Sequence, residues 1–232
     1  VTYEVTDNFS LRAGYSNVFG GLDLGDSFEF WLTRDYSGLR PSRAQNIIIG
    51  ADWTPGAWTI SGELFKTKFD DARDGATVVD FESQGVNIGA TYGWGSGFAR
   101  LSYAYSDASL DGAPSSSFDL RDFGAPLGHV LSVEVQQELM HYNTLLGGSI
   151  EAAASYDAGG SYAGKELPSY VVANVFAEYT PPAWNGVSIR GSINNLFDET
   201  YADRATYGGE FTGFQTMNEP GRNFVVEAVM KF

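Results

Sequence analysis

Arg222-Asn223-Phe224-Val225-Val226-Glu227-Ala228-Val229-Met230-Lys231-Phe232 closes the chain, and apolar side chains fill every second position of it. Successive side chains of a β-strand point to opposite faces. One face of this segment therefore carries Phe224, Val226, Ala228, Met230 and Phe232. The other face carries Asn223, Glu227 and Lys231, with Val225 and Val229 between them. A strand that is apolar on one side and charged on the other is typical of a wall with lipid outside and polar contents inside.

Composition agrees with such a wall but does not reveal it. No stretch of the 232 residues approaches the roughly 18 continuous apolar residues of a membrane helix. The mean hydropathy of -0.18 alone would indicate a soluble protein. A membrane barrel can have the same low mean hydropathy, because half of the side chains of each strand face a polar interior. The chain has no cysteine, which excludes disulfides and thiolate metal sites.

The net charge of -15 argues against nucleic-acid binding through phosphate neutralisation. Much of the acid falls in segments that we predict to be loops. Two interpretations stay open: solvated loops, or an acidic outer surface that meets divalent cations or a cationic ligand. The residues concerned are Asp23, Asp26, Glu29, Asp35, Asp70, Asp71, Asp74, Asp107 and Asp111.

Apolar alternation recurs along the chain and predicts about eleven strands. Tight turns, such as Thr54-Pro55-Gly56 and the run from 181 to 186, alternate with long connections near 18–44 and 107–127. Short periplasmic turns and long extracellular loops alternate in this way in outer-membrane barrels. The pattern therefore predicts an all-β fold, an antiparallel transmembrane β-barrel.

Two further patterns favour a membrane barrel over a soluble sandwich. Aromatic residues gather beside the short turns, as an interfacial girdle requires: Phe9, Trp53, Trp58, Tyr92, Trp94, Phe98, Tyr179 and Trp184. Charged residues occupy the inward face at mid-strand, which water or a polar plug tolerates and lipid does not: Arg12, Glu63, Arg100, Glu134, Glu151, Glu178, Arg190 and Glu227.

Eleven strands do not make a closed bacterial barrel, because those barrels have even strand numbers and no open edge in hydrocarbon. The chain also opens within a strand pattern at Val1. We therefore expect the chain to be part of a longer wall.

A motif near the end of the chain reads Asn194-Asn195-Leu196-Phe197-Asp198-Glu199-Thr200-Tyr201. It resembles the signature that ends the penultimate strand of the TonB-dependent outer-membrane receptors. Pro220-Gly221-Arg222 and a last strand ending in Phe232 follow at the family's spacing. Leu167-Pro168-Ser169-Tyr170 and Asp35-Tyr36-Ser37-Gly38-Leu39-Arg40-Pro41 also resemble family elements. Locally, Asn195 and Asp198 suit hydrogen bonds to backbone where a strand turns into a loop.

The resemblance implies that residues 1–232 form the C-terminal half of a 22-strand barrel in the outer membrane of a Gram-negative cell. The plug, the TonB box and the first half-barrel would then belong to the same polypeptide or to a partner chain. It further implies contact with outer-membrane lipid and LPS, engagement of the TonB complex through the plug, and no covalent chemistry, hence no enzyme and no cofactor.

By the same resemblance, the expected function is energised import of a ferric siderophore or similar large iron chelate. Loop aromatics and arginines would contact it, because aromatics give rigid apolar contact and Arg pairs with anionic chelates. The predicted ligand-binding residues are Arg34, Tyr36, Arg121, Phe123, Arg204, Tyr207 and Phe211, with Phe30, Trp31 and Phe214 as further loop aromatics.

Alternatives stay open. A haem receptor would need an extracellular histidine. His129, near the outer end of its strand, is the candidate, whereas His141 falls beside a short turn. A cobalamin receptor and a passive pore are two more. Hydrolysis would need a Ser–His pair, but His129 and Ser132 lie three apart on a strand and so face opposite sides.

Overall fold

The computed structural model describes residues 1–20, 41–74, 77–114, 128–157, 166–184, 186–204, 208–210, 213–215 and 218–230. Within those ranges nearly all regular structure is β. The elements are β1 Thr2–Thr6, β2 Phe9–Phe19, β3 Arg43–Trp53, β4 Trp58–Asp74, β5 Thr77–Trp94, β6 Gly97–Leu110, β7 Ala113–Pro114, β8 Gly128–Leu139, the 3-10 helix η1 Met140–Tyr142, β9 Thr144–Ala153, β10 Tyr156–Asp157, β11 Glu166–Leu167, β12 Tyr170–Tyr179, β13 Val187–Asn194, β14 Gly208–Glu210, β15 Gly213–Gln215 and β16 Asn223–Met230. No helix in the described ranges is long and apolar enough to cross a membrane.

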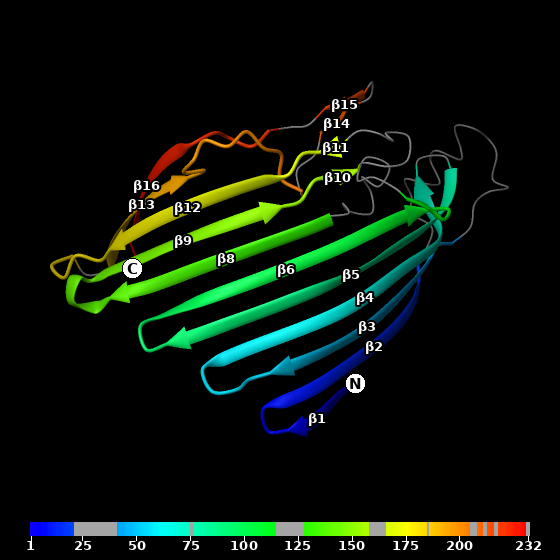
Figure 1. Ribbon diagram of the computed structural model, residues 1–232, viewed down its shortest axis with the longest axis horizontal. Helices are drawn as coiled ribbons and strands as arrows, with labels where there is room; N and C mark the ends of the chain where they lie inside the picture. The colour runs from blue at the N-terminus through cyan, green and yellow to red at the C-terminus, as the bar shows by residue number, and fades with distance from the viewer. Residues whose placement is uncertain are drawn as a thin grey trace.

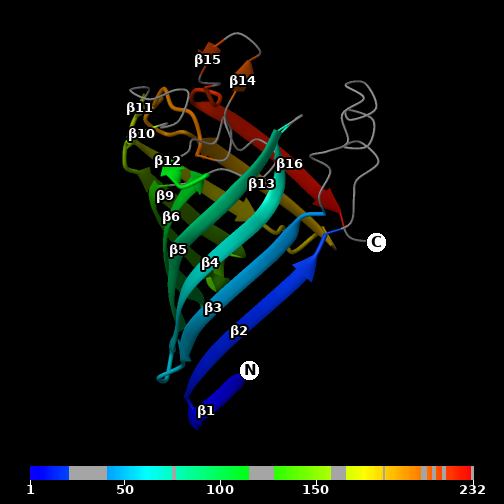
Figure 2. The same cartoon turned by 90° about the vertical axis from the view of Figure 1, so that its right-hand side faces the viewer.

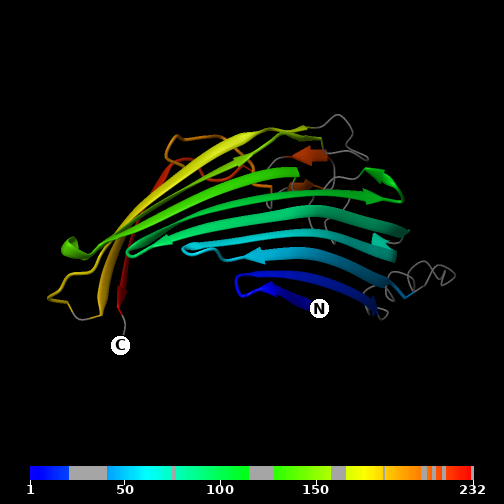
Figure 3. The same cartoon turned by 60° about the horizontal axis from the view of Figure 1, so that its bottom comes forward.

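One large sheet contains twelve strands (Figure 1). Its path runs β1-β2-β3-β4-β5-β6-β8-β9-β12-β13-β16, and β7 pairs beside it with β6. The pairs are antiparallel, and the path of eleven strands confirms the predicted number. Figures 2 and 3 show that the sheet curls into an open trough. β1 and β16 are its two free edges, so the described sheet is a partial barrel.

The short connections lie together at one end of the sheet, here called the turn end, and the long ones at the other, the loop end (Figure 1). Two turns need a left-handed backbone: Gly56 has a φ of 63° and Asn143 a φ of 49°. Glycine adopts this region without steric cost and asparagine tolerates it. The tight turns predicted at 54–56 and 181–186 are confirmed between β3 and β4 and between β12 and β13.

The outward face of the sheet is apolar and exposed. Cross-strand pairing places Leu11, Ala51, Gly62, Ile88 and Tyr103 in one row of that face. Leu64 is 60% exposed and Val226 79%. So much exposed aliphatic surface is foreign to a water-soluble monomer and suits the lipid-facing band of a barrel.

Aromatic side chains border this band at the turn end. Trp58 stacks on Tyr92 with ring centroids 4.9 Å apart, and Tyr92 on Trp94 at 5.9 Å. Trp53, Tyr179 and Trp184 are also largely exposed. Amphipathic rings favour the boundary between lipid and water, and their position matches the predicted girdle.

Towards the loop end, the two faces exchange polarity. Beyond Leu64 the outward positions of β4 become charged, and Lys66 forms an ion pair with Glu82 at 2.6 Å. On the inward face Phe69 packs on Phe81, 5.7 Å between centroids. Strands β4 and β5 have 17 and 18 residues, more than the roughly 9–11 that cross a bilayer. They therefore continue past the lipid.

This extension corrects the sequence prediction for four acidic residues. Asp70, Asp71 and Asp74 lie in β4 and Asp107 lies in β6, not in loops. The prediction was wrong because apolar alternation stops where the lipid stops, whereas the hydrogen-bonded ladder continues. Asp111, which has a φ of 49°, lies after β6 as predicted.

Several glycines lie directly opposite a large side chain on the neighbouring strand. Phe65 pairs with Gly85, and a Cβ on Gly85 would lie 2.6 Å from the ring. Arg12 pairs with Gly50, where the gap would be 2.7 Å. Phe176 likewise covers Gly147. A cross-strand glycine lets a large side chain lie flat on the sheet, a recognised device in curved sheets.

An arginine introduced on β6 should cost much more stability on the lipid face than on the inward face. We expect Leu101→Arg to lower the free energy of unfolding by about 2–4 kcal/mol, because Leu101 faces lipid near mid-strand. Ser102→Arg should cost far less, because Ser102 lines a cavity on the inward face. Urea titration of the complete receptor refolded into lipid vesicles measures both. Equal losses would contradict the assignment of faces.

The glycine contacts make a second prediction. Gly147→Ala should lower the free energy of unfolding by about 1–3 kcal/mol, since the new Cβ collides with the Phe176 ring. Gly191→Ala is the matched control, because nothing lies within 4 Å of that Cβ. The same titration should leave the control within about 0.5 kcal/mol of wild type. A control as unstable as Gly147→Ala would refute the steric explanation.

Candidate functional site

The concave face of the trough is polar and forms the candidate site. Two cavities of about 390 and 330 Å³ lie on it, each lined by side chains from five strands of the large sheet. All eight charged residues predicted to face inward lie on this face, because each pairs in register with other inward positions. Seven of them fall into three groups along the sheet, whereas Glu151 accepts from the Tyr170 hydroxyl.

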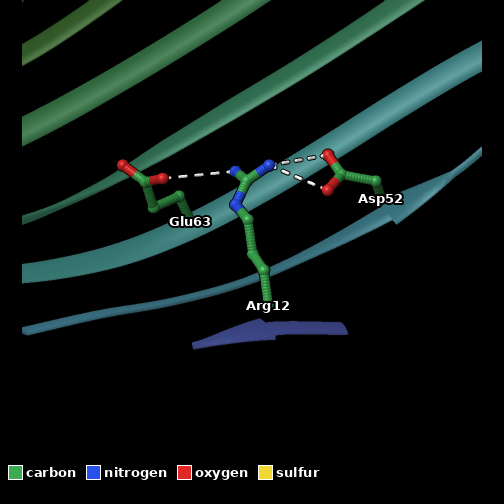
Figure 4. Close-up of polar contacts among 3 residues, drawn as sticks. All are labelled: Arg12, Asp52 and Glu63. Atoms are coloured by element: carbon green, nitrogen blue, oxygen red, sulfur yellow. Dashed lines mark hydrogen bonds and ion pairs between the residues drawn. The ribbon is translucent and has the colours of Figure 1, made fainter. Parts of the chain in front are cut away.

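The first group joins β2, β3 and β4 (Figure 4). Arg12 Nη1 donates to Asp52 Oδ1 at 2.9 Å and Oδ2 at 2.8 Å, and Nη2 donates to Glu63 Oε2 at 3.2 Å. Gly50 pairs with both Arg12 and Glu63. Because Gly50 has no side chain, the guanidinium crosses β3 above it and reaches the third strand. One cation thus holds two carboxylates and leaves the group net negative.

The second group joins β6 and β8. Arg100 pairs in register with Glu134, with Nη1 3.4 Å from Oε2. Gln136 donates to the other oxygen of Glu134 at 2.8 Å. Glu134 therefore has a partner at each carboxylate oxygen, which fixes its orientation toward the interior.

The third group joins β12, β13 and β16. The Arg190 guanidinium lies 3.7 Å from the centroid of the Phe176 ring, which itself covers Gly147. Glu178 and Glu227 flank Arg190 in the register of the neighbouring strands. A cation stacked on an aromatic face keeps its N–H groups available at its edge.

Residues 196–204, here called the strap, pack against the loop ends of β9 and β12, where the Tyr201 ring lies beside Tyr170. Asn195 immediately precedes the strap and is 3% exposed. Its Nδ2 donates to the Glu199 carbonyl at 2.8 Å, and its Oδ1 accepts from the Glu199 N–H at 2.8 Å. Asp198 Oδ1 accepts from the Arg222 N–H at 2.7 Å. The predicted backbone-bonding roles of Asn195 and Asp198 are therefore confirmed.

Arg204 is the single predicted ligand-binding residue whose side chain lies within the described ranges, and it is 2% exposed. Its Nη2 donates to the carbonyls of Ala154 and Pro168, both at 2.6 Å. The guanidinium also lies 5.3 Å from the Tyr170 ring centroid. Burial lowers the pKa of Arg204 from its ordinary value. These contacts turn Arg204 toward the wall, and its contact with a ligand stays a prediction.

The other predicted ligand-binding residues lie outside the described residues, and their contacts stay predictions. They are Arg34, Tyr36, Arg121, Phe123, Tyr207 and Phe211, together with Phe30 and Trp31. Of Phe214 only the backbone, in β15, is described.

The two histidines lie at opposite ends of the sheet. His129 pairs with Tyr105 on the outward face, and its Nδ1 lies 2.8 Å from the Tyr103 hydroxyl. His129 therefore lies near the loop end of its strand, as predicted, but on the outward face and not on the concave one. Ser132 lies on the opposite face, as predicted, and lines the interior cavities. His141 lies in η1, at the turn end. Among the described residues, no cluster of three or more His, Asp or Glu could hold a metal.

Some contacts of the site were not predictable from alternation. Tyr170 donates to Glu151 at 2.7 Å, and the Tyr201 ring lies 4.8 Å from that of Tyr170. The alternation of β12 placed Tyr170 on the inward side but could not show that residue 201 returns to it. The family motif at 194–201 was the only signal in the sequence that an ordered segment follows β13.

Comparison with known proteins identifies the family to which the chain belongs. Residues 1–196 match the family described as TonB dependent receptor-like, beta-barrel. The heme transporter BhuA of Brucella abortus is 24% identical over 249 aligned residues, which cover all of this chain and 37% of the relative. The vitamin B12 transporter BtuB of Photobacterium profundum is 23% identical and covers 99% of the chain. The chain thus spans little more than a third of the length of these curated relatives.

Solved structures show the same fold. The FrpB iron transporter from Neisseria meningitidis superposes with a TM-score of 0.80 at 19% identity, over all of this chain and 37% of that one. The copper transporter OprC gives 0.76 at 17% identity, over all of this chain and 39% of the other. The ferric-catecholate import receptor Fiu of E. coli gives 0.71 at 16% identity.

The Arg12 group makes a testable prediction. Arg12→Gln should lower the free energy of unfolding by up to about 1 kcal/mol, because the pair is partly exposed and two carboxylates lose their shared cation. The loss should shrink in about 1 M NaCl, where the screening length falls to about 3 Å. Arg100→Gln is the control, because Arg100 has a single, longer ion pair and a smaller expected loss. A loss that salt does not change would contradict an electrostatic origin.

Proposed function

Because the chain belongs to the TonB dependent receptor-like β-barrel family, whose members are outer-membrane receptors, we propose that it forms part of the wall of a receptor that imports a ferric siderophore or similar large iron chelate. Energy for import would come through TonB. The observation that carries this proposal is the family match together with a polar concave wall below long connections.

The structure supports this proposal through the arrangement of its faces. Apolar side chains cover the convex side, and six carboxylates and three guanidiniums stand on the concave side: Asp52, Glu63, Glu134, Glu151, Glu178, Glu227, Arg12, Arg100 and Arg190. A wall with so many oriented charges suits a folded polypeptide inside it, because charges buried against protein need partners. An open pore would need only water there.

The partners follow as proposals. A plug with its TonB box and further barrel strands would complete the receptor, since the chain spans 37% of the length of its curated relatives. The exposed convex face would contact outer-membrane lipid and LPS. Arg34, Tyr36, Arg121, Phe123, Arg204, Tyr207 and Phe211 would contact the cargo from the long connections.

Haem is the second candidate cargo. A relative named as a heme transporter matches the whole chain at 24% identity, which favours it. Against it, His129 faces outward and His141 lies at the turn end, so neither is presented to a cargo entering from the loop end. A haem receptor would then need its iron ligand from elsewhere in the receptor. Cobalamin has weaker support, from one relative at 23% identity.

Uptake by a deletion strain tests the function. We expect loss of the gene to abolish growth on one or more ferric siderophores as sole iron source and to reduce uptake of radiolabelled iron to background. A strain without TonB should show the same loss, and complementation should restore uptake. Rescue by haem or cobalamin alone would replace the cargo with that compound. Unchanged uptake of every chelate, haem and cobalamin would refute the proposal.

A further inference from the structure

Two small hairpins stand beyond the loop end of the sheet (Figures 1 and 2). β10 and β11 form the first, within the connection from β9 to β12. β14 and β15 form the second, within the connection from β13 to β16. The hairpins belong to different connections, so any link between them must come from side chains or from backbone at their bases.

Arg204 provides such a link. Ala154 precedes the first hairpin and Pro168 follows it, and both carbonyls accept from Arg204 Nη2 at 2.6 Å. Arg204 itself lies in the other connection, four residues before β14 begins at Gly208. One buried guanidinium therefore closes the base of the first connection while it belongs to the second.

Further contacts hold the strap in this position. The Tyr201 ring packs on Tyr170, whose hydroxyl is held by Glu151 at 2.7 Å. The Tyr201 carbonyl accepts from the Glu219 N–H at 2.8 Å, which ties the strap to the chain returning toward β16. A small cavity of about 40 Å³ lies between the strap and residues 168–170. The strap is thus packed on the wall and bonded at its return.

We propose that Arg204 is a positioning residue that couples the two connections, so that their hairpins move as one unit over the mouth of the barrel. The fork geometry of arginine serves this role, because its N–H groups lie in a fixed plane and reach two carbonyls at once. Removal of the guanidinium leaves two carbonyls without their donor in a buried site, which is costly. Coupled hairpins would present one cargo surface instead of two independent ones. This last consequence rests on the proposed function, whereas the coupling itself does not.

Pulsed electron spin resonance tests the coupling without any cargo. One spin label replaces Asp157 in the first hairpin and a second replaces Gly209 in the second, in the complete receptor in lipid vesicles. Arg204→Met, which keeps much of the volume and removes every donor, should broaden the interspin distance distribution. Arg204→Lys should give an intermediate width, because one ammonium replaces the planar fork.

Two controls keep the test sharp. Arg100→Met removes an arginine of the concave wall that is remote from the strap and should leave the distribution unchanged. Tyr201→Leu removes the ring contact with Tyr170 but leaves Arg204 and both carbonyls intact, so it should broaden the distribution less than Arg204→Met. If Arg204→Met does not assemble, Arg204→Lys decides. An unchanged distribution in Arg204→Met, or in Arg204→Lys where the former fails to assemble, would overturn the proposal.

Cargo binding gives a separate readout. If the receptor imports a chelate, Arg204→Met should weaken cargo binding roughly tenfold, with Arg204→Lys partly restoring it. A broadened distance distribution with unchanged cargo affinity would retain the coupling and remove its role in recognition. Absence of uptake in the wild type would refute the proposed function and leave the spin-label result to decide the coupling.

Discussion

Backbone hydrogen bonding in a medium without water is the constraint on which this structure depends. Inside hydrocarbon each N–H and C=O needs a protein partner, and a curled antiparallel sheet supplies one for every strand except at its edges. The eleven strands of the path meet this demand pairwise from β1 to β16. Only once the backbone is satisfied can the side chains divide into a face for lipid and a face for the interior. The free edges of β1 and β16 need further strands wherever they meet lipid.

Alternation in the sequence was enough to predict the class, the strand number and the face of most residues. Leu131 and Val135 lie outward and Ser132 and Glu134 inward, as their spacing requires. Strand length was harder, because the pattern near Lys66 reverses rather than ends. A reversal of polarity looks like a loop to any method that follows only the apolar face. The extended part of β4 and β5 was missed for this reason.

The candidate site was predictable in kind but not in detail. The inward charges were identified individually, yet their partners depend on register, which alternation does not determine. Arg12 reaches Glu63 because Gly50 lies between them, and Arg190 rests on Phe176 because Gly147 lies beneath the ring. Residue type alone predicted Arg204 as a ligand contact, and no pattern in the sequence indicated that its guanidinium is buried against two carbonyls. Its contact with a ligand stays a prediction.

The exchange of polarity above Leu64 has a consequence for insertion. A shift of the sheet by one residue pair along the membrane normal would draw Lys66 and Glu82 into hydrocarbon on one side and lift Trp58 and Tyr92 out of the headgroup layer on the other. Both displacements carry a cost. The charged rows and the aromatic rings therefore resist the same displacement from opposite ends of the strands, and together they favour one immersion depth of the wall.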